Sequence, residues 1–168
     1  GNLNLFFYLN KRLDNLKYYF KDQISVEEKV KKIINQKRLN NLILGQYEFS
    51  ELIDVLYFGS SLQYIDSYKD KISPFFQKAR YILIAQTPFF ENQKLNEKII
   101  LKQLNMHPVI NYLYMFNFSH FINFMEKNNY ILMEKNINKV TKFLNFKNFD
   151  KKKYINLNMY DLLFKYKK

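Results

Sequence analysis

Residues 54–66 read DVLYFGSSLQYID, and the rest of the fold can be worked out from this segment. An acidic residue leads into an apolar run of strand length, and Gly59 and two serines separate that run from an amphipathic stretch. The chain has only three glycines, so a glycine at the end of a predicted buried strand needs a reason. It indicates either a close approach of the backbone to a ligand, or an ordinary turn into a helix with Ser60 or Ser61 as N-cap.

Other apolar runs predict further strands along the chain. We expect them at about 16–22, 41–45, 54–58, 80–86 and 130–133, with one or two more near the C-terminus. Residues 80–86, RYILIAQ, are the clearest buried strand, and Pro88 is expected to end it. We expect residues 89–117 to be irregular or partly helical, and residues 135–153 to form an extended arm or loop.

Helical spacing of apolar residues predicts three helical stretches between the strands. The first covers about 25–35, with Ser25 as N-cap and Glu28 completing a capping box. The second covers about 62–79 and is expected to break and restart at Pro74. The third begins near Ser119 and ends at Asn128.

Alternating strands and helices predict an α/β fold, with a mostly parallel sheet, helices on both faces and an antiparallel edge. The sequence shows neither an internal repeat nor a linker, so we expect a single domain over residues 1–168. Hydrophobic residues make up 48% of the 168 residues and aromatic residues 18%, which is enough for a packed core. Disorder is therefore not expected.

The composition excludes several classes of site. Cysteine is absent, so a disulfide framework, a thiolate zinc site and a cysteine nucleophile are impossible. This absence is compatible with a reducing compartment, and we expect a cytoplasmic protein. No stretch of about 18 uncharged apolar residues occurs, so no membrane span is expected.

The net charge is +12, from 27 basic and 15 acidic residues, and it has two interpretations. A basic chain favours an anionic partner such as nucleic acid, a phosphorylated sugar or a membrane surface. However, the lysines are spread along the chain and do not cluster with aromatic residues, which is typical of a solvated basic surface. We expect no specific nucleic-acid partner, and a basic anion-binding module stays the weakest alternative.

Polar or small residues follow three of the predicted strands, where a parallel sheet binds its ligands. They are Asp22 and Gln23, then Gly59, Ser60 and Ser61, then Gln86, Thr87 and Pro88. Asp22 occupies a place from which a carboxylate can accept hydrogen bonds from a ribose diol. It can equally serve as a charge at the N-terminus of the helix that follows.

Most catalytic motifs are missing from the sequence. It has no GxSxG segment, no P-loop and no HExxH, and we expect no metal site. His107, in the segment LNMHPV, is a candidate general base because its ordinary pKa lies near neutrality. A lone loop histidine is more often not catalytic, and His120, in the first turn of a predicted helix, is expected to be structural.

Three segments carry a resemblance to a known family. They are DVLYFGSSLQYIDSYKDKI (54–72), RYILIAQTPFF (80–90) and FSHFINFMEKNNYILMEKN (118–136). In order and spacing they resemble a family of S-adenosylmethionine-dependent methyltransferases that accompany bacterial surface-polysaccharide genes. The matching positions are Leu62-Gln63-Tyr64, Thr87-Pro88-Phe89 and Asn129-Tyr130, together with Lys21-Asp22-Gln23 upstream.

The resemblance implies a Rossmann-like class I methyltransferase sheet, S-adenosylmethionine as cofactor and a small polar, sugar-derived acceptor. Cofactor contacts would come from Gly1, Asn2, Asp22, Gln23, Phe58, Gly59 and Ser60, with Asp22 accepting the ribose hydroxyls. Gln63, Tyr64 and Thr87 would face the acceptor, and His107 would be the base for a hydroxyl acceptor.

The chain departs from the family at its start. Such enzymes begin with a strand and a glycine-rich loop, whereas this sequence opens with GNLNLFFYL, which looks like the last glycine of that loop followed by the first helix. The resemblance therefore implies an N-terminally truncated member that lacks the first strand. Two functions stay open at this point: an active methyltransferase, or an inactive methyltransferase-like scaffold that binds a partner. The oligomeric state cannot be predicted.

Overall fold

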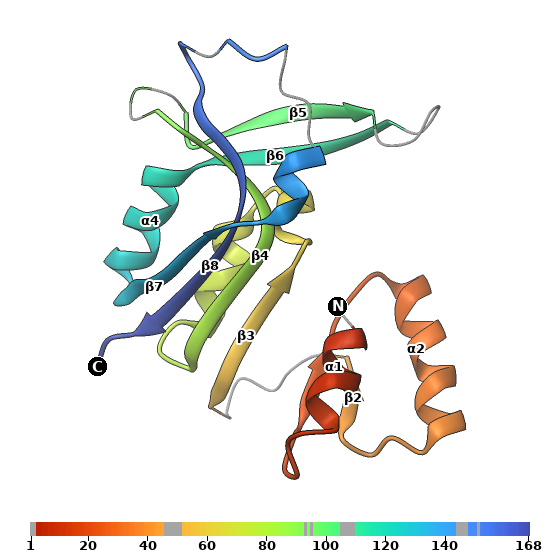
Figure 1. The fold of residues 1–168 in the computed structure, drawn as a ribbon. Helices are drawn as coiled ribbons and strands as arrows, with labels where there is room; N and C mark the ends of the chain where they lie inside the picture. Colours follow the sequence, from red (N-terminus) through yellow and green to blue (C-terminus); the bar gives the residue numbers. More distant parts are fainter. Residues whose placement is uncertain are drawn as a thin grey trace. The chain divides into compact units, whose positions relative to one another are not determined.

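The structure is a computed structural model that describes residues 3–45, 52–92, 94, 96–104, 110–143, 148–150 and 152–168. The chain divides into two compact units, Gly1–Ser50 and Glu51–Lys168, and each is described here by itself (Figure 1). Gly1, Asn2 and His107 lie outside the described residues. The prediction of one domain over the whole chain stays a prediction.

The first unit has two helices and a small parallel sheet. Its elements are α1 (Leu3–Asn10), β1 (Tyr18–Phe20), α2 (Ile24–Lys37) and β2 (Leu42–Leu44), and β1 pairs with β2. One buried side chain from each element forms the core, namely Phe6, Phe20, Val30 and Leu42. The predicted strand–helix–strand order of this part is confirmed.

The start of α2 differs from the prediction. The N-cap is Gln23 rather than Ser25, which lies inside the first turn. Glu27 rather than Glu28 reaches back, and its Oε1 accepts a hydrogen bond from the backbone nitrogen of Asp22 at 2.9 Å. The helix ends where Arg38 adopts φ 51°, in the left-handed region that terminates many helices.

The second unit is built on a six-stranded sheet whose order is β5-β6-β4-β8-β7, with β3 also paired to β4. The strands are β3 (Ile53–Gly59), β4 (Ala79–Glu91), β5 (Lys98–Leu104), β6 (Ile110–Asn117), β7 (Tyr130–Ile137) and β8 (Ile155–Tyr166). Strand β4 runs parallel to β3 and β6, and β8 lies antiparallel between β4 and β7. This confirms the predicted α/β sheet with parallel strands and an antiparallel edge.

Strand β4 is longer than predicted, because Pro88 does not end it. Residues 79–85 of β4 pair with β3, and Phe89 and Phe90 pair with β6, so Pro88 lies between these two stretches. A proline lacks the N–H that a ladder needs, and a gap between two partner strands tolerates that loss. On its other edge β4 pairs with β8, with a register shift between Ile84 and Thr87.

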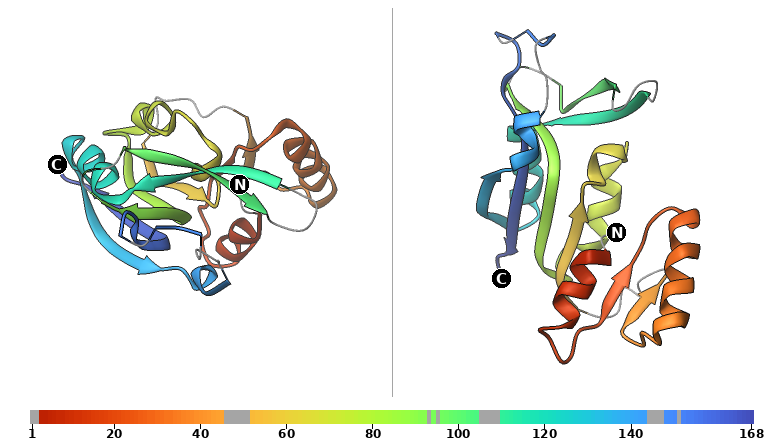
Figure 2. Two further views of the ribbon diagram at one scale, coloured as in Figure 1. Left: turned by 90° about the horizontal axis from the view of Figure 1, so that it is seen from above. Right: turned by 45° about the vertical axis from the view of Figure 1, so that its right-hand side comes forward.

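The prediction that residues 89–117 are irregular or partly helical is wrong for most of the described residues in this range, because they form strands. They contain the end of β4 and the antiparallel strands β5 and β6, which pair with each other and are drawn in green and teal in Figure 2. The C-terminal segment forms one long strand, β8, and β7 continues to Ile137, inside the predicted arm. A 3₁₀ helix, η3 (Lys139–Phe143), then follows.

The helical region that follows β3 consists of shorter pieces than predicted. Residues 62–79 form η1 (Leu62–Tyr64), α3 (Tyr68–Ile72) and η2 (Ser73–Phe75), with Pro74 in the first turn of η2. Helix α4 (Phe118–Lys127) begins after Asn117 rather than at Ser119. It stops before Asn128, as predicted, and Asn129 has φ 64°.

Aromatic side chains join α3 and α4 to one face of the sheet. The Tyr68 ring stacks on Phe121 with a centroid distance of 5.4 Å and meets Phe116 of β6 edge-on at 4.8 Å. On the same face, β8 contributes Phe164, whose ring lies 6.1 Å from that of Phe121. These contacts hold α3 against the end of the sheet at which β5 begins and β6 ends.

Candidate site at the carboxyl end of β3

Strand β3 carries the glycine and serines that the sequence singled out. It was predicted to be a buried strand, but Asp54 and Val55 are exposed because, among the described strands, β3 pairs only with β4. At its carboxyl end the backbone nitrogen of Ser60 donates to the carbonyl of Ala85 at 3.0 Å, which continues the pairing with β4. Gly59 and Ser60 therefore lie at the carboxyl end of β3, where its parallel pairing with β4 stops.

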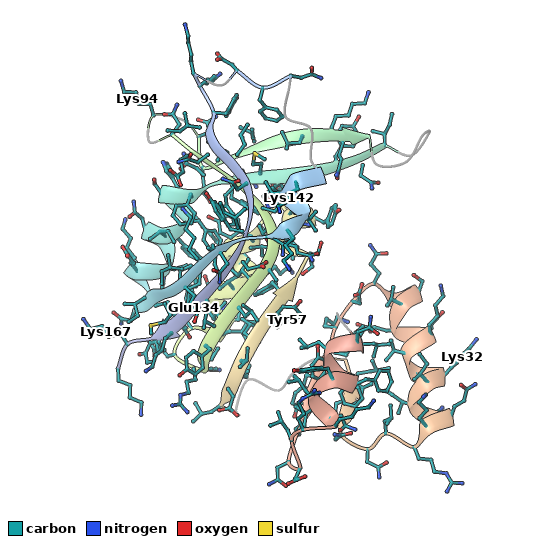
Figure 3. All side chains as sticks on the ribbon, viewed as in Figure 1. Lys32, Tyr57, Lys94, Glu134, Lys142 and Lys167 are labelled. Carbon is teal, nitrogen blue, oxygen red and sulfur yellow. The ribbon has the colours of Figure 1, made fainter. Side chains whose placement is uncertain are left out.

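Gly59 does not make the sharp turn itself. The positive φ at this point belongs to Ser60, at 51°, and Gly59 is outside the left-handed region. A Cβ on Gly59 would stand 2.4 Å from the hydroxyl oxygen of Tyr57, which is labelled in Figure 3. The missing side chain therefore leaves space for the Tyr57 ring beside the strand end.

Gln63 is the most distinctive polar residue of this strand end. Its side chain is only 2% exposed, and its Nε2 donates to Ser60 Oγ at 3.2 Å. Its Oε1 is buried and has no hydrogen-bond partner among the described residues. A buried carbonyl oxygen without a partner is costly, so this atom fits a ligand that supplies a donor. The neighbouring Tyr64 is 52% exposed and borders the same turn.

The other predicted site residues have surroundings of their own. Thr87 is fully buried inside β4, and its hydroxyl donates to the carbonyl of Ala85 at 3.3 Å. Phe58 is half-buried and packs on the core. Asp22 and Gln23 belong to the first unit, where Asp22 Oδ1 accepts a hydrogen bond from the Gln23 backbone at 2.8 Å.

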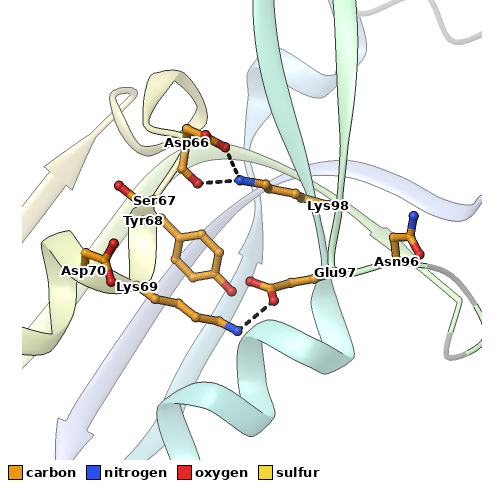
Figure 4. A pocket seen from close by; sticks show the side chains of 8 residues that line it. All are labelled: Asp66, Ser67, Tyr68, Lys69, Asp70, Asn96, Glu97 and Lys98. Atoms are coloured by element: carbon orange, nitrogen blue, oxygen red, sulfur yellow. Dashed lines mark hydrogen bonds and ion pairs between the residues drawn. The ribbon is translucent and has the colours of Figure 1, made fainter.

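Two residues after Tyr64, the chain enters a pocket of about 440 Å³ that sequence reasoning missed. Its lining comes from the start of α3 and from the residues before and at the start of β5 (Figure 4). The lining residues are Asp66, Ser67, Tyr68, Lys69, Asp70, Asn96, Glu97 and Lys98. The polar run from Asp66 to Asp70 was visible in the sequence, but Glu97 and Lys98 lie in a segment predicted to be irregular.

Two ion pairs cross the pocket. Lys69 Nζ lies 2.7 Å from Glu97 Oε2, and Lys98 pairs with the carboxylate of Asp66. Burial alone would raise the pKa of Glu97, but hydrogen bonds from Lys69 and Tyr68 and the positive charges of Lys69 and Lys98 together lower it. The hydrogen bond from Lys98 likewise lowers the pKa of Asp66. Both carboxylates are therefore ionised at neutral pH and act only as acceptors.

Comparison by sequence finds no relative: no family model matches the chain, and no curated protein does. Comparison by structure finds several. The glycopeptide N-methyltransferase MtfA complexed with S-adenosyl-L-homocysteine (SAH) is similar with a TM-score of 0.53 and 7% identity, over 89% of this chain and 71% of that one. The fold is that of a class I methyltransferase.

Two further structures share this fold. The N-terminal domain of EvdMO1, in the presence of SAH and D-fucose, has a TM-score of 0.52 and 7% identity, over 83% of this chain. An S-adenosylmethionine-dependent methyltransferase from Clostridium acetobutylicum ATCC 824 has a TM-score of 0.51 and 9% identity, over 89% of this chain and 74% of that one. The chain spans 61% of the length of the EvdMO1 domain.

No described helix is long and apolar enough to cross a membrane. The described part of the chain also contains no group of three or more histidine, aspartate or glutamate side chains that could hold a metal ion.

Proposed function

We propose that this chain is an S-adenosylmethionine-dependent methyltransferase, or a part of one, that acts on a small, polar, sugar-derived acceptor. The observation that carries the proposal is the sheet, in which antiparallel β8 lies between β4 and β7 and parallel β3 flanks β4. The similar structures of MtfA and EvdMO1 contain SAH, and EvdMO1 was crystallised with D-fucose. A role in surface-polysaccharide biosynthesis in the cytoplasm follows from the sequence resemblance.

The strand ends supply the residues that would hold the cofactor. Gly59 and Ser60 end β3 at the edge where ligands bind to parallel sheets, and the unpartnered Gln63 Oε1 is buried beside them. Asp22, at the end of β1, would accept the ribose hydroxyls. Gln23, Phe58, Gly1 and Asn2 stay predicted cofactor contacts. Thr87 is not among the proposed contacts, because its side chain is buried and its hydroxyl already donates to the carbonyl of Ala85.

The bound cofactor would supply an electrophilic methyl group, and the work of the protein would be to position the acceptor in line with it. Tyr64 is exposed beside Gln63 and would contact the acceptor. An amine acceptor that is already deprotonated needs no base, whereas a hydroxyl acceptor needs one for its proton. His107 stays the predicted base for that case.

Isothermal titration calorimetry with SAH tests the cofactor assignment. The protein encoded by the whole reading frame should bind SAH, and Gln63→Leu should weaken binding about tenfold, the effect of one lost hydrogen bond. Gln36→Leu, on the exposed side of α2, is the matched control and should leave affinity unchanged. If neither this chain nor the protein encoded by the whole reading frame binds SAH, the methyltransferase proposal fails. An inactive scaffold is then the better description.

A further inference from the structure

The pocket between α3 and β5 is polar on nearly every side. Small-molecule sites of about 300–1,000 Å³ are usually lined mainly by apolar side chains with a few polar groups. Here the lining consists of three carboxylates, two lysines, a serine, an asparagine and a tyrosine. A ligand that fits such a lining must form hydrogen bonds over most of its own surface, as a polyhydroxylated molecule does.

The hydroxyl of Tyr68 is the second observation that indicates a ligand. The residue is 2% exposed, and its Oη is buried without a hydrogen bond of ordinary geometry to any described residue. Figure 4 shows this end of the ring between the side chains of Lys69 and Glu97. Burial, together with a hydrogen bond to the Glu97 carboxylate and its charge, raises the pKa of Tyr68, so the hydroxyl keeps its proton and can donate to a ligand in place of Glu97.

The charges of the pocket oppose those of the protein. Lys69 is neutralised by Glu97 and Lys98 by Asp66, which leaves Asp70 as an exposed carboxylate with no ion pair among the described residues. The lining therefore carries one net negative charge on a chain whose net charge is +12. A local excess of carboxylate attracts a ligand that carries one positive charge.

We propose that this pocket binds an amino sugar, whose hydroxyls pair with the lining side chains and whose ammonium group lies against Asp70. The Tyr68 hydroxyl donates to a ring or hydroxyl oxygen of the sugar. The pocket follows directly on Gln63 and Tyr64, the proposed contacts of the methyl-transfer site. The inference rests on the proposed function only in naming the bound amino sugar as the methyl acceptor.

The test is a titration of the whole protein with three sugars, followed by nuclear magnetic resonance. Glucosamine, glucose and glucuronate share a ring and differ in charge. Glucosamine should bind about tenfold more tightly than glucose, as expected for one added charged contact, and should shift the amide signals of residues 66–70 and 96–98. Glucuronate should not bind there. Equal affinity for the three sugars, or no shifts at these residues, would overturn the proposal.

Two variants separate binding from folding. Asp70→Asn should abolish the preference for glucosamine over glucose, whereas Asp54→Asn, an equally exposed change on β3, should keep it. Tyr68→Phe should weaken sugar binding about tenfold, and any fall in the thermal unfolding midpoint should be limited to the lost interaction of the hydroxyl with the Glu97 carboxylate. A Tyr68→Phe protein with lower stability and unchanged sugar affinity would show a structural hydroxyl and refute the assignment.

Binding of SAH is measured separately on the same samples. If SAH binds and glucosamine does not, the pocket assignment fails while the proposed methyltransferase function stands. If glucosamine binds and SAH does not, the pocket is a sugar site and the methyltransferase proposal fails.

Discussion

Replacing Asp161 with asparagine is expected to lower the free energy of unfolding by about 2–4 kcal/mol. The Asp161 carboxylate accepts three hydrogen bonds. One comes from the backbone nitrogen of Gln86 to Oδ1 at 2.8 Å, and two come from Asn138 Nδ2, to Oδ2 at 2.8 Å and to Oδ1 at 3.1 Å. These contacts link β8 both to the irregular point of β4 and to the residue that follows β7.

The size of the expected stability loss follows from the hydrogen bonds that an asparagine can form at position 161. Its carbonyl oxygen can still accept the hydrogen bond from Gln86, but its NH₂ group then faces the NH₂ group of Asn138. One hydrogen bond to a charged acceptor is lost, worth about 1.5–3 kcal/mol, and a partly buried donor is left without a partner. Because the hydrogen bond from Gln86 remains, the stability loss should be smaller than the loss caused by removing the whole side chain.

Urea unfolding followed by far-ultraviolet circular dichroism measures the loss. Asp54→Asn, at an exposed position of β3, is the control and should change stability by less than about 0.5 kcal/mol. The double variant Asp161→Asn with Asn138→Asp restores a carboxylate opposite an amide, so it should regain part of the stability lost. Equal unfolding midpoints for Asp161→Asn and Asp54→Asn would refute the reasoning.

Three further expectations concern the same unit. Tyr130→Phe should cost about 1–3 kcal/mol in urea unfolding, because Tyr130 Oη donates to the buried carbonyl of Ala79 at 2.6 Å and that carbonyl would lose this donor. Gln86→Gly should raise the thermal midpoint, since Gln86 adopts φ 51° and glycine relieves about 1 kcal/mol of strain there; an unchanged or lower midpoint would contradict this. Burial alone would raise the pKa of Glu91, but hydrogen bonds from Asn156 and Lys135 lower it below its ordinary 4.5. The stability difference between the native protein and Glu91→Gln should therefore be full above pH 4.5 and shrink as the pH falls through the lowered pKa.

Local patterns predicted much of the fold correctly. Apolar runs located β1, β2, β3, β7 and the first half of β4, because a strand that packs on a core must carry apolar side chains. Helical spacing located α2 and α4 for the same reason. The capping positions were less predictable, because several polar residues near each helix start can serve and the tertiary contacts select among them.

The errors fell on β4, β5 and β6. Pro88 was predicted to end a strand, but a proline is tolerated where β4 changes partners from β3 to β6, and the sequence does not show which strand lies beside which. Strands β5 and β6 were missed because their exposed face also carries apolar side chains, with Ile100 and Tyr112 more than 60% exposed. Their pattern therefore lacks the simple alternation of a half-buried strand.

The candidate site was likewise predicted only in part from the sequence. The strand end at Gly59 and Ser60 was found from residue type alone, and Gln63 and Tyr64 were found from the resemblance. The pocket beside them was not found, because Lys69 and Glu97 lie 28 residues apart along the chain. Long-range pairs of this kind are created by the packing of α3 against the end of the sheet.

By itself, the sequence determined the class of fold, the order of most elements and the polar strand end, because local backbone preferences and hydrophobic periodicity act over a few residues. Only the tertiary structure decided why Gly59 is a glycine, which residue takes the left-handed turn and which charges meet in the pocket. Gly59 leaves space for Tyr57, and Ser60 makes the turn. Those answers depend on side chains that meet in three dimensions, and such contacts have no signature in local spacing.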